Sequence, residues 1–289
     1  MTRLKGFLAA CALCVTATTY ADSYIWQVSD GDSTLYIGGT IHMLKPSDYP
    51  LPTEFPAAFS AADKIVFETN MDVVSDPAFS QKLQQAMMLP KGKTLQDQVS
   101  EKTWARLSEY AISRQLPLAP MQAFQPAFVA LAFTMMEMQK LGFGDGIDQK
   151  YFAQAKAQNK TLGELETADE QLSFMVAMTE MDPDLFINAT LDDLEQMAEL
   201  FDQMVGEWRE GDADELFALM GKPMLDEAPA LYDLILTERN KTWVPHIKQL
   251  LETPETELVL VGALHLAGPD SVLLMLQQAG LSVTRYQPE

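Results

Sequence analysis

Two histidines in matching sequence frames are the residues of this chain whose type and spacing best suit chemistry. One frame, Leu35–His42, reads LYIGGTIH, and the other, Val259–Leu266, reads VLVGALHL. Both contain Gly-x-x-His, and together they hold two of the three histidines in the chain. Each apolar run predicts a buried strand, and its glycine allows a close backbone approach just before the imidazole. Ligands of parallel α/β sheets bind at the carboxyl ends of strands, so we expect His42 and His265 to face a site.

A third predicted strand end supplies a carboxylate. Glu68 follows the apolar run IVF, and a charge at the end of a buried strand is unusual. If the three strands are parallel neighbours, His42, Glu68 and His265 converge as two imidazoles and one carboxylate. Such a set binds first-row metals, and Mn²⁺, Zn²⁺, Co²⁺ and Fe²⁺ all remain open. A metal there would activate water and polarise a carbonyl, which places all three residues in catalytic positions. The alternative is a pair of hydrogen-bonded core histidines and an exposed carboxylate.

Four further polar residues are candidates for supporting roles. Glu164 and Glu166 bracket a short predicted strand, where one of them either supports the site as a general base or caps a helix. Arg239 and Asn240 lie on a predicted helix that leads into the second histidine strand. Arg239 suits a catalytic or binding clamp for a substrate carboxylate or an oxyanion, and the alternative is a structural salt bridge. We therefore expect Arg239, Asn240 and Glu166 to bind substrate.

Strand patterns occur at both ends of the chain, and the middle is helical, amphipathic and rich in methionine. This order predicts an α/β fold of mixed α+β character, with a central mixed sheet built from N- and C-terminal segments and a long helical insertion at about 76–233. Pro245 predicts a kink or break in a helix over 231–251, and the third histidine, His246, is expected to be structural or exposed. Strands are predicted at 23–28, 34–41, 64–70, 161–165, 258–261 and 282–286. Helices are predicted at 54–62, 76–88, 101–115, 123–141, 147–158, 168–180, 191–210, 213–220, 231–251 and 270–279.

The first residues predict export. Arg3 and Lys5 precede an apolar run and a small-x-Ala site at Ala21, which is typical of a secretory signal peptide over 1–21. A single domain then spans 22–289. Both cysteines, Cys11 and Cys14, lie in the segment that would be removed, so the mature chain would have no thiol. Lipidation at Cys11 is the alternative. We expect a periplasmic or secreted protein without cysteine chemistry.

Charge and missing motifs exclude several classes of function. The formal net charge of −21 disfavours binding to nucleic acid and to anionic membranes. The sequence contains no His-Glu-x-x-His, Gly-x-Ser-x-Gly or phosphate-binding glycine loop, so it gives no support to zincin, serine-hydrolase or NTPase chemistry. The 17 methionines indicate either an adaptable core or a flexible apolar groove for peptides or lipids.

These motifs together resemble those of the TraB/GumN family, which includes the Tiki metalloproteases and is distantly similar to ChaN and erythromycin-esterase-like folds. The resemblance implies a divalent-metal-dependent, peptidase-like site with His42, Glu68 and His265 in the key positions. It also implies a recurrent motif at Arg239 and Asn240. This chain departs from the Tiki members in showing no membrane anchor. The matching segments are 35–42, 66–68, 162–167, 238–240 and 261–268.

Two functions follow from the same residues. The first is a secreted or periplasmic metal-dependent hydrolase that cleaves peptide or amide bonds of a peptide or protein substrate. The second is a protein that sequesters a peptide, a metal or haem-like iron without turnover, which the resemblance supports because TraB-type members are associated with shutting down a peptide signal. An open coordination position facing a cleft distinguishes the first from the second. Neither function fixes the oligomeric state.

Overall fold

The computed structural model describes residues 23–288 of the chain, so the predicted signal peptide and Cys11 lie outside the described residues. Six strands form one sheet in the order β6-β4-β7-β2-β1-β8. The strands β6, β4, β7 and β2 are parallel to one another, whereas β1 is antiparallel to both β2 and β8. Their bounds are β1 Ile25–Ser29, β2 Thr34–Thr40, β4 Lys64–Phe67, β6 Thr161–Glu164, β7 Glu257–Gly262 and β8 Ser282–Arg285. This arrangement confirms the predicted α/β fold with a mixed central sheet.

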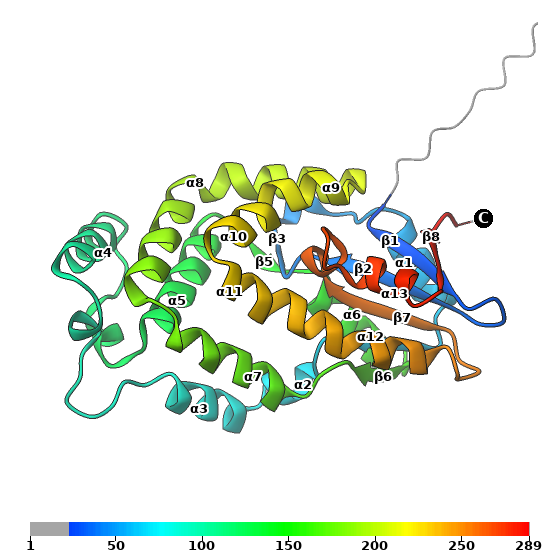
Figure 1. The fold of residues 1–289 in the computed structure, drawn as a ribbon, viewed down its shortest axis with the longest axis horizontal. Helices are drawn as coiled ribbons and strands as arrows, with labels where there is room; N and C mark the ends of the chain where they lie inside the picture. Colours follow the sequence, from blue (N-terminus) through cyan, green and yellow to red (C-terminus); the bar gives the residue numbers. More distant parts are fainter. Residues whose placement is uncertain (1–22, 289) are drawn as a thin grey trace, which may run out of the picture.

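Helices cover both faces of the sheet, and further helices extend from one end of it (Figure 1). Between β4 and β7 the chain is mostly helical, with β6 and the two-residue strand β5 as interruptions. The α-helices are α1 Glu54–Ala61, α2 Met71–Val74, α3 Pro77–Ala86, α4 Glu101–Ser113, α5 Pro126–Lys140, α6 Ile147–Ala157, α7 Ala168–Ala177, α8 Pro183–Glu210, α9 Ala213–Leu216, α10 Lys222–Glu227, α11 Pro229–Tyr232, α12 Glu238–Leu250 and α13 Val272–Gln278.

The two largest of the three hydrophobic cores in residues 23–288 correspond to these two parts. The larger core packs the sheet against α1, α6, α12 and α13, and its central strand β7 contributes Leu258–Val261, all fully buried. A continuous apolar strand of this kind is expected where helices cover both faces of a parallel sheet. The second core joins α4, α5 and the first half of α8. The two cores meet along α8, whose buried Trp208 donates from Nε1 to the Gly39 carbonyl oxygen of β2 at 2.7 Å.

The structure corrects two sequence-based boundaries. Helix α8 begins at Pro183 and not near residue 191, because the Asp182 side chain accepts from the backbone N–H groups of Asp184 and Leu185 and so caps it. The predicted interruption at Pro245 does not end a helix, since α12 continues through it. The helical path is instead irregular before α12, where a π-helical turn, η6 (Asp233–Thr237), precedes Arg239.

Two short elements adjoin the first histidine. Strand β3 (Met43–Leu44) pairs with β5 (Gly144–Asp145), which directly precedes α6.

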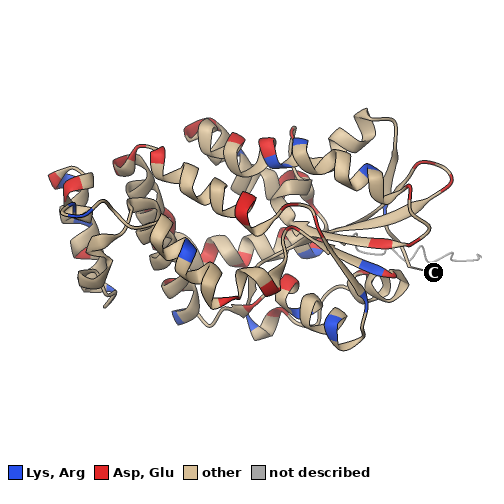
Figure 2. Ribbon diagram, turned by 90° about the horizontal axis from the view of Figure 1, so that it is seen from below, with Lys and Arg blue, Asp and Glu red and all other residues tan. Residues whose placement is uncertain are grey.

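None of the helices within residues 23–288 combines the length and the hydropathy that a membrane crossing needs. Acidic side chains are distributed along many of the elements, as the 41 Asp and Glu residues against 20 Lys and Arg predict (Figure 2).

Candidate functional site

The order of the parallel strands brings the predicted site residues to one edge of the sheet. Strand β4 lies between β6 and β7, and β7 lies between β4 and β2. In the register of these pairs, Phe67 is opposite both Glu164 and Leu260, and Thr40 is opposite Gly262. The residues that follow these strands therefore start from neighbouring positions. Glu166, Glu68, His265 and His42 all belong to this set.

His42 is oriented by a carboxylate from α6. The ring Nδ1–H donates to Asp148 Oδ2 at 2.8 Å, and Asp148 Oδ1 accepts from the Thr40 hydroxyl at 2.8 Å. The Asp148 charge raises the pKa of His42 to about 9. The imidazole itself is 61% exposed, so Nε2 faces an accessible part of the site and solvent weakens the pairing. With this pKa the ring is an imidazolium at neutral pH, so the carboxylate on Nδ1 fixes the direction of Nε2, which must lose its proton before it can bind a metal.

Gly146 allows this contact because the backbone before α6 lies directly against His42. A Cβ at Gly146 would lie 2.1 Å from the carbonyl oxygen of Ile41 and 2.3 Å from the carbonyl carbon of His42. The Ile147 N–H also donates to Ile41 O at 3.1 Å. Only a residue without a side chain permits this approach, which places Asp148 in the first turn of α6 beside the imidazole.

Glu68 is buried, and two donors hold its carboxylate. Oε2 accepts from Arg239 Nη2 at 2.6 Å, and Oε1 accepts from the backbone N–H of Gly262 at 2.7 Å. Burial opposes the negative charge, but the charges of Arg239, His265 and His42 outweigh it and lower the pKa of Glu68 to about 2. The side chain is therefore a carboxylate across the physiological pH range.

His265 lies in η7 (Ala263–Leu266), the turn that follows β7, and its ring is fixed on both sides. Nδ1–H donates to Asn240 Oδ1 at 2.6 Å, and Asn240 Nδ2 donates to Asp270 O at 2.7 Å. Nε2 then carries the lone pair and accepts from Arg239 Nη1 at 3.2 Å. Burial lowers the pKa of His265 to about 3, despite the opposing charge of Glu68. The ring is neutral at neutral pH.

Arg239 connects the carboxylates and the buried histidine. Its Nε and Nη2 donate to the two oxygens of Glu166 at 3.1 and 2.7 Å, which is bidentate pairing. Its guanidinium carbon lies 4.6 Å from the ring centroid of Trp243, whose Nε1 also donates to Glu166 at 3.1 Å. Burial opposes the positive charge, but Glu68 and Glu166 raise the pKa of Arg239. For Glu166 the effect of burial prevails over that of its partners: burial raises its pKa, although Arg239 and Trp243 act to lower it.

The three proposed metal ligands converge on the Cα of Gly262. A Cβ at this position would lie 3.3 Å from Glu68 Oε1, 3.4 Å from His42 Nε2 and 3.5 Å from His265 Cδ2. Glu68 Oε1 and His265 Nε2 are 3.9 Å apart. Within residues 23–288, no group of three His, Cys, Asp or Glu side chains is already arranged as a metal site. The donor types are those that bind first-row ions, but His265 Nε2 is paired with Arg239 Nη1 and Glu68 Oε1 with the Gly262 N–H, so an ion here would have to replace these contacts.

Sequence reasoning missed Asp148 and Trp243, and the remaining candidates lie apart from the site centre. Asp148 gives no sequence signal beyond an acidic residue in the first turn of a helix, where acids are common. Glu164 is exposed, whereas Glu166 is buried on Arg239. His246 is exposed, and its Nδ1 is paired with Leu165 O at 2.8 Å, in agreement with the structural role expected for it.

The fold and this edge define a class: an α/β protein with two Gly-x-x-His histidines and a glutamate at adjoining parallel strand ends. The chain belongs to the TraB/PrgY/gumN family, whose model matches residues 24–285. It is similar to the uncharacterized protein YbaP of Escherichia coli strain K12 and to YbaP of Shigella flexneri. Each is 27% identical over 269 residues, covering 90% of this chain and 96% of the relative. No solved structure gives a significant match.

Proposed function

We propose that this protein is a metal-dependent hydrolase that cleaves peptide or amide bonds. The observation that carries the proposal is the shared orientation of the two histidines. Each has its Nδ1–H held by a side-chain oxygen, Asp148 for His42 and Asn240 for His265. Each thus turns Nε2 toward the part of the site where Glu68 Oε1 lies. Metal-binding histidines in proteins are held in this way, with the second nitrogen donating to an oxygen.

The roles of the residues follow from these contacts. His42, Glu68 and His265 would hold Mn²⁺, Zn²⁺, Co²⁺ or Fe²⁺, and such an ion supplies an activated water and a polarised carbonyl when bound. Within residues 23–288, Arg239 supplies the guanidinium in contact with these residues, so it would bind a substrate carboxylate or stabilise negative charge on an oxygen. Glu166 and Trp243 hold Arg239 in place.

Two of the expected substrate-binding residues have full sets of protein partners. Asn240 uses Oδ1 on His265 and Nδ2 on a backbone carbonyl, and the residue is 1% exposed. Glu166 uses both oxygens on Arg239 and Trp243. In the proposed mechanism these two side chains position His265 and Arg239, and Arg239 is the residue of the three that meets substrate.

The second candidate, sequestration without turnover, is favoured by one contact. Arg239 Nη1 occupies the lone pair of His265 Nε2, and its Nη2 occupies Glu68 Oε2. A guanidinium in this place neutralises the site without a metal. A protein that keeps this arrangement would bind a peptide without hydrolysing it, whereas sequestration of a metal or haem-like iron would require Arg239 to leave these atoms.

Metal content and peptide hydrolysis, measured on the same preparations, separate the two functions. The wild type, His42→Ala, Glu68→Gln and His265→Ala would be loaded with each of the four metals and assayed against a peptide library. His246→Ala and Glu164→Gln are matched controls, because both residues are exposed and lie outside the site. Loss of metal and turnover in the three site variants alone supports the hydrolase. Metal bound through these residues without turnover supports sequestration, and no metal under any loading excludes the metal site.

The location of the protein is part of the proposal. We propose that residues 1–21 direct export to the periplasm, after which the chain carries no cysteine. Mass spectrometry of the protein from a periplasmic extract tests this directly. A mature chain that starts at residue 22 is expected, and a full-length chain confined to the cytoplasmic fraction would contradict export. A lipid-modified Cys11 would support the lipoprotein alternative.

A further inference from the structure

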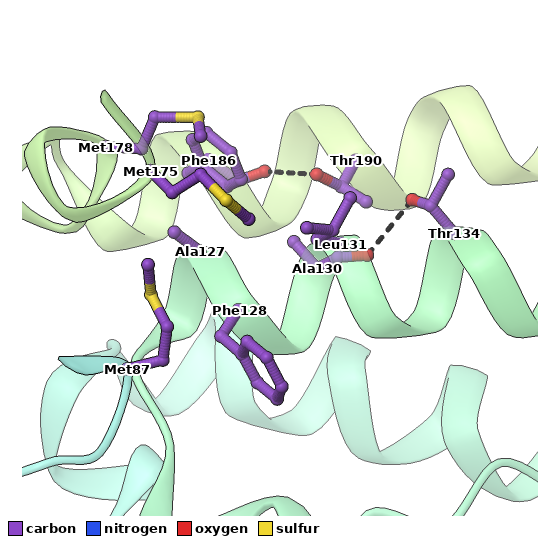
Figure 3. Close-up of a pocket in the computed structure, with 10 residues that line it drawn as sticks. All are labelled: Met87, Ala127, Phe128, Ala130, Leu131, Thr134, Met175, Met178, Phe186 and Thr190. Carbon is purple, nitrogen blue, oxygen red and sulfur yellow. Dashed lines mark hydrogen bonds between the residues drawn. The ribbon is translucent and has the colours of Figure 1, made fainter. Parts of the chain in front are cut away.

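Two hollows lie on either side of the first half of α8. The first is an apolar cavity of about 160 Å³ between α5, the end of α7 and α8. Met87, Met175, Met178 and Phe186 contribute to its walls (Figure 3). The hydroxyls of its two threonines, Thr134 and Thr190, already donate to backbone carbonyls four residues earlier in their own helices.

The second hollow is a groove of about 360 Å³ between α8 and the segment from η5 (Phe217–Gly221) to α11. Phe186 and Thr190 line both hollows, so they adjoin through α8. Along the groove, α8 presents Leu185, which is 51% exposed, and Leu200. The opposite wall presents Met220 and Met224. An exposed leucine and flexible methionines are typical of surfaces that adapt to an apolar partner.

The charge of the groove has one sign. Asp182, Asp193 and Glu227 are among its lining residues, and neither hollow has a lysine or arginine in its lining within the described chain. Asp193 and Glu227 come from opposite walls. A fatty acid or another anionic lipid would meet repulsion here, and an apolar segment with a cationic side chain would meet attraction.

The groove follows α8 for several turns. On this helix its lining runs from Leu185 to Leu200, about 15 residues or roughly 22 Å. Asp202, which pairs with Lys45 after His42, lies two residues beyond Leu200 and so points to the opposite side of α8. On the other wall, Met220 precedes Gly221, at which a Cβ would lie 3.2 Å from Leu264. The groove and the strand-end site therefore lie on different sides of these two segments.

We propose that the groove between α8 and α10–α11 binds an extended peptide segment of apolar residues that carries a lysine or arginine side chain over Asp193 and Glu227. The apolar side chains of the peptide lie against Leu185, Leu200 and the two methionines. Naming this peptide the substrate rests on the proposed function, whereas its binding does not require turnover. The groove gives the protein its preference for basic apolar sequences.

Fluorescence anisotropy with two labelled ten-residue peptides tests the binding. One peptide contains leucine and alanine with two lysines, and the other has glutamate in place of lysine. Metal-free wild type and Glu68→Gln are used, so that hydrolysis does not interfere. We expect the lysine peptide to bind more tightly, and the double variant Asp193→Asn/Glu227→Gln to weaken its binding about fivefold. Glu199→Gln is the matched control, because Glu199 is exposed on the same helix outside the groove lining.

The outcomes separate this inference from the proposed function. Equal binding of the two peptides would overturn the proposal that the groove binds a basic apolar segment. An equal loss of affinity in the double variant and in the Glu199 control would also overturn it. Self-association of the chain that Leu185→Glu abolishes also overturns it, because the occupant is then a second copy. If the double variant weakens peptide binding but no metal gives hydrolysis, the peptide-binding inference stands and the proposed hydrolase function is excluded. Hydrolysis with a KM that the double variant does not change removes the inference alone.

Discussion

The strand-end site and the helical groove are built in opposite ways. At the site, the polar atoms of Glu68, Glu166 and Arg239 are tied to one another and to the backbone, and the carboxylates are nearly buried. In the groove, Leu185 is half exposed and the methionines Met220 and Met224 have flexible side chains. The charged hydrogen bonds therefore hold the side chains of the site in one arrangement. In the groove, we expect the flexible side chains to adopt several arrangements of similar free energy.

This contrast shows how one chain divides fixed chemistry from adaptable recognition. A buried network of charges is costly to disturb, because each group that loses its partner remains desolvated. An apolar surface with space beside it tolerates changes of side chain at little cost. Substitutions in the two regions should therefore differ most in their effect on the free energy of unfolding.

The largest effect is expected from Arg239→Met. This change leaves Glu68 and Glu166 as facing buried carboxylates without their cation, and it should lower the free energy of unfolding by about 3–5 kcal/mol at pH 7. Urea denaturation measures it. Arg106→Met is the control, because Arg106 pairs with the exposed Asp192 and should cost at most about 1 kcal/mol. Similar losses in both variants would contradict the large cost that we assign to disturbing the buried charges of the site.

The next largest effect is expected in the pH dependence of the free energy of unfolding, and we assign it to the buried His265. An unfolded histidine takes up a proton below its ordinary pKa of 6.5, but folded His265 does so only near 3. Stability should therefore fall as the pH drops below 6.5, by about 3 kcal/mol between pH 7 and pH 4.5. Glu68 adds a further loss as the pH falls from 4.5 toward 2. His265→Gln should remove most of the first loss in urea titrations, and His246→Gln should retain it.

His42 acts in the opposite direction. Its pKa is raised to about 9, so its pairing with Asp148 stabilises the fold below pH 6.5 and is lost as the pH rises through 9. Because the imidazole is mostly exposed, this loss should be smaller than the acid effect of His265. Comparison of the wild type with His42→Gln between pH 6 and pH 10 measures the difference. If the variant loses as much stability as the wild type when the pH rises through 9, the loss comes from groups other than His42.

A smaller effect is expected from Gly146→Ala. The added methyl group would overlap the backbone of Ile41 and His42, so α6 must shift and carry Asp148 away from the imidazole. We expect a loss of about 1–3 kcal/mol in unfolding free energy, together with a changed His42 ring signal in NMR spectra. Gly144→Ala is the control, since no atom lies within 4 Å of the added group there. A normal His42 signal in the Gly146 variant would show that the contact is not needed.

The smallest effect is expected from Leu185→Ala. The side chain is 51% exposed in the groove, so its loss should change the free energy of unfolding by less than about 0.5 kcal/mol. Leu191→Ala, two turns further along α8, removes a leucine that is 1% exposed and should cost about 2–5 kcal/mol. If the two substitutions cost the same, the groove is part of the packed core and is not a free surface.

The strand-end part of the fold could be derived from the sequence because its signals are local and strong. The runs before His42, Glu68 and His265 are apolar, and each is followed at once by a residue that is out of place in a core. Parallel strands with polar ends must share one edge, so three distant residues could be placed together. The strand order β6-β4-β7-β2 agrees with that inference.

The parts that sequence reasoning missed depend on contacts between distant segments. Asp148 lies in the first turn of α6, and only the close approach at Gly146 shows why it meets His42. The role of Asn240 as a partner of His265 depends on where the η6 turn places α12. The start of α8 at Pro183 follows an Asp-Pro pair, but the same two residues are common in loops, so the sequence alone does not distinguish a capped helix start from a loop.

The pairing of β2 with β7 determines when the site can form. Gly38 is opposite Leu260, so neighbouring strands of one sheet come from the two ends of the chain. Contacts between residues so far apart in sequence are formed late and slowly during folding. Since synthesis starts at the N-terminus, His42 and Glu68 emerge long before β7 and His265 complete the edge. A chain that stops before β7 therefore lacks both His265 and the strand that joins β4 to β2, so the arrangement of His42, Glu68 and His265 forms only in the complete fold.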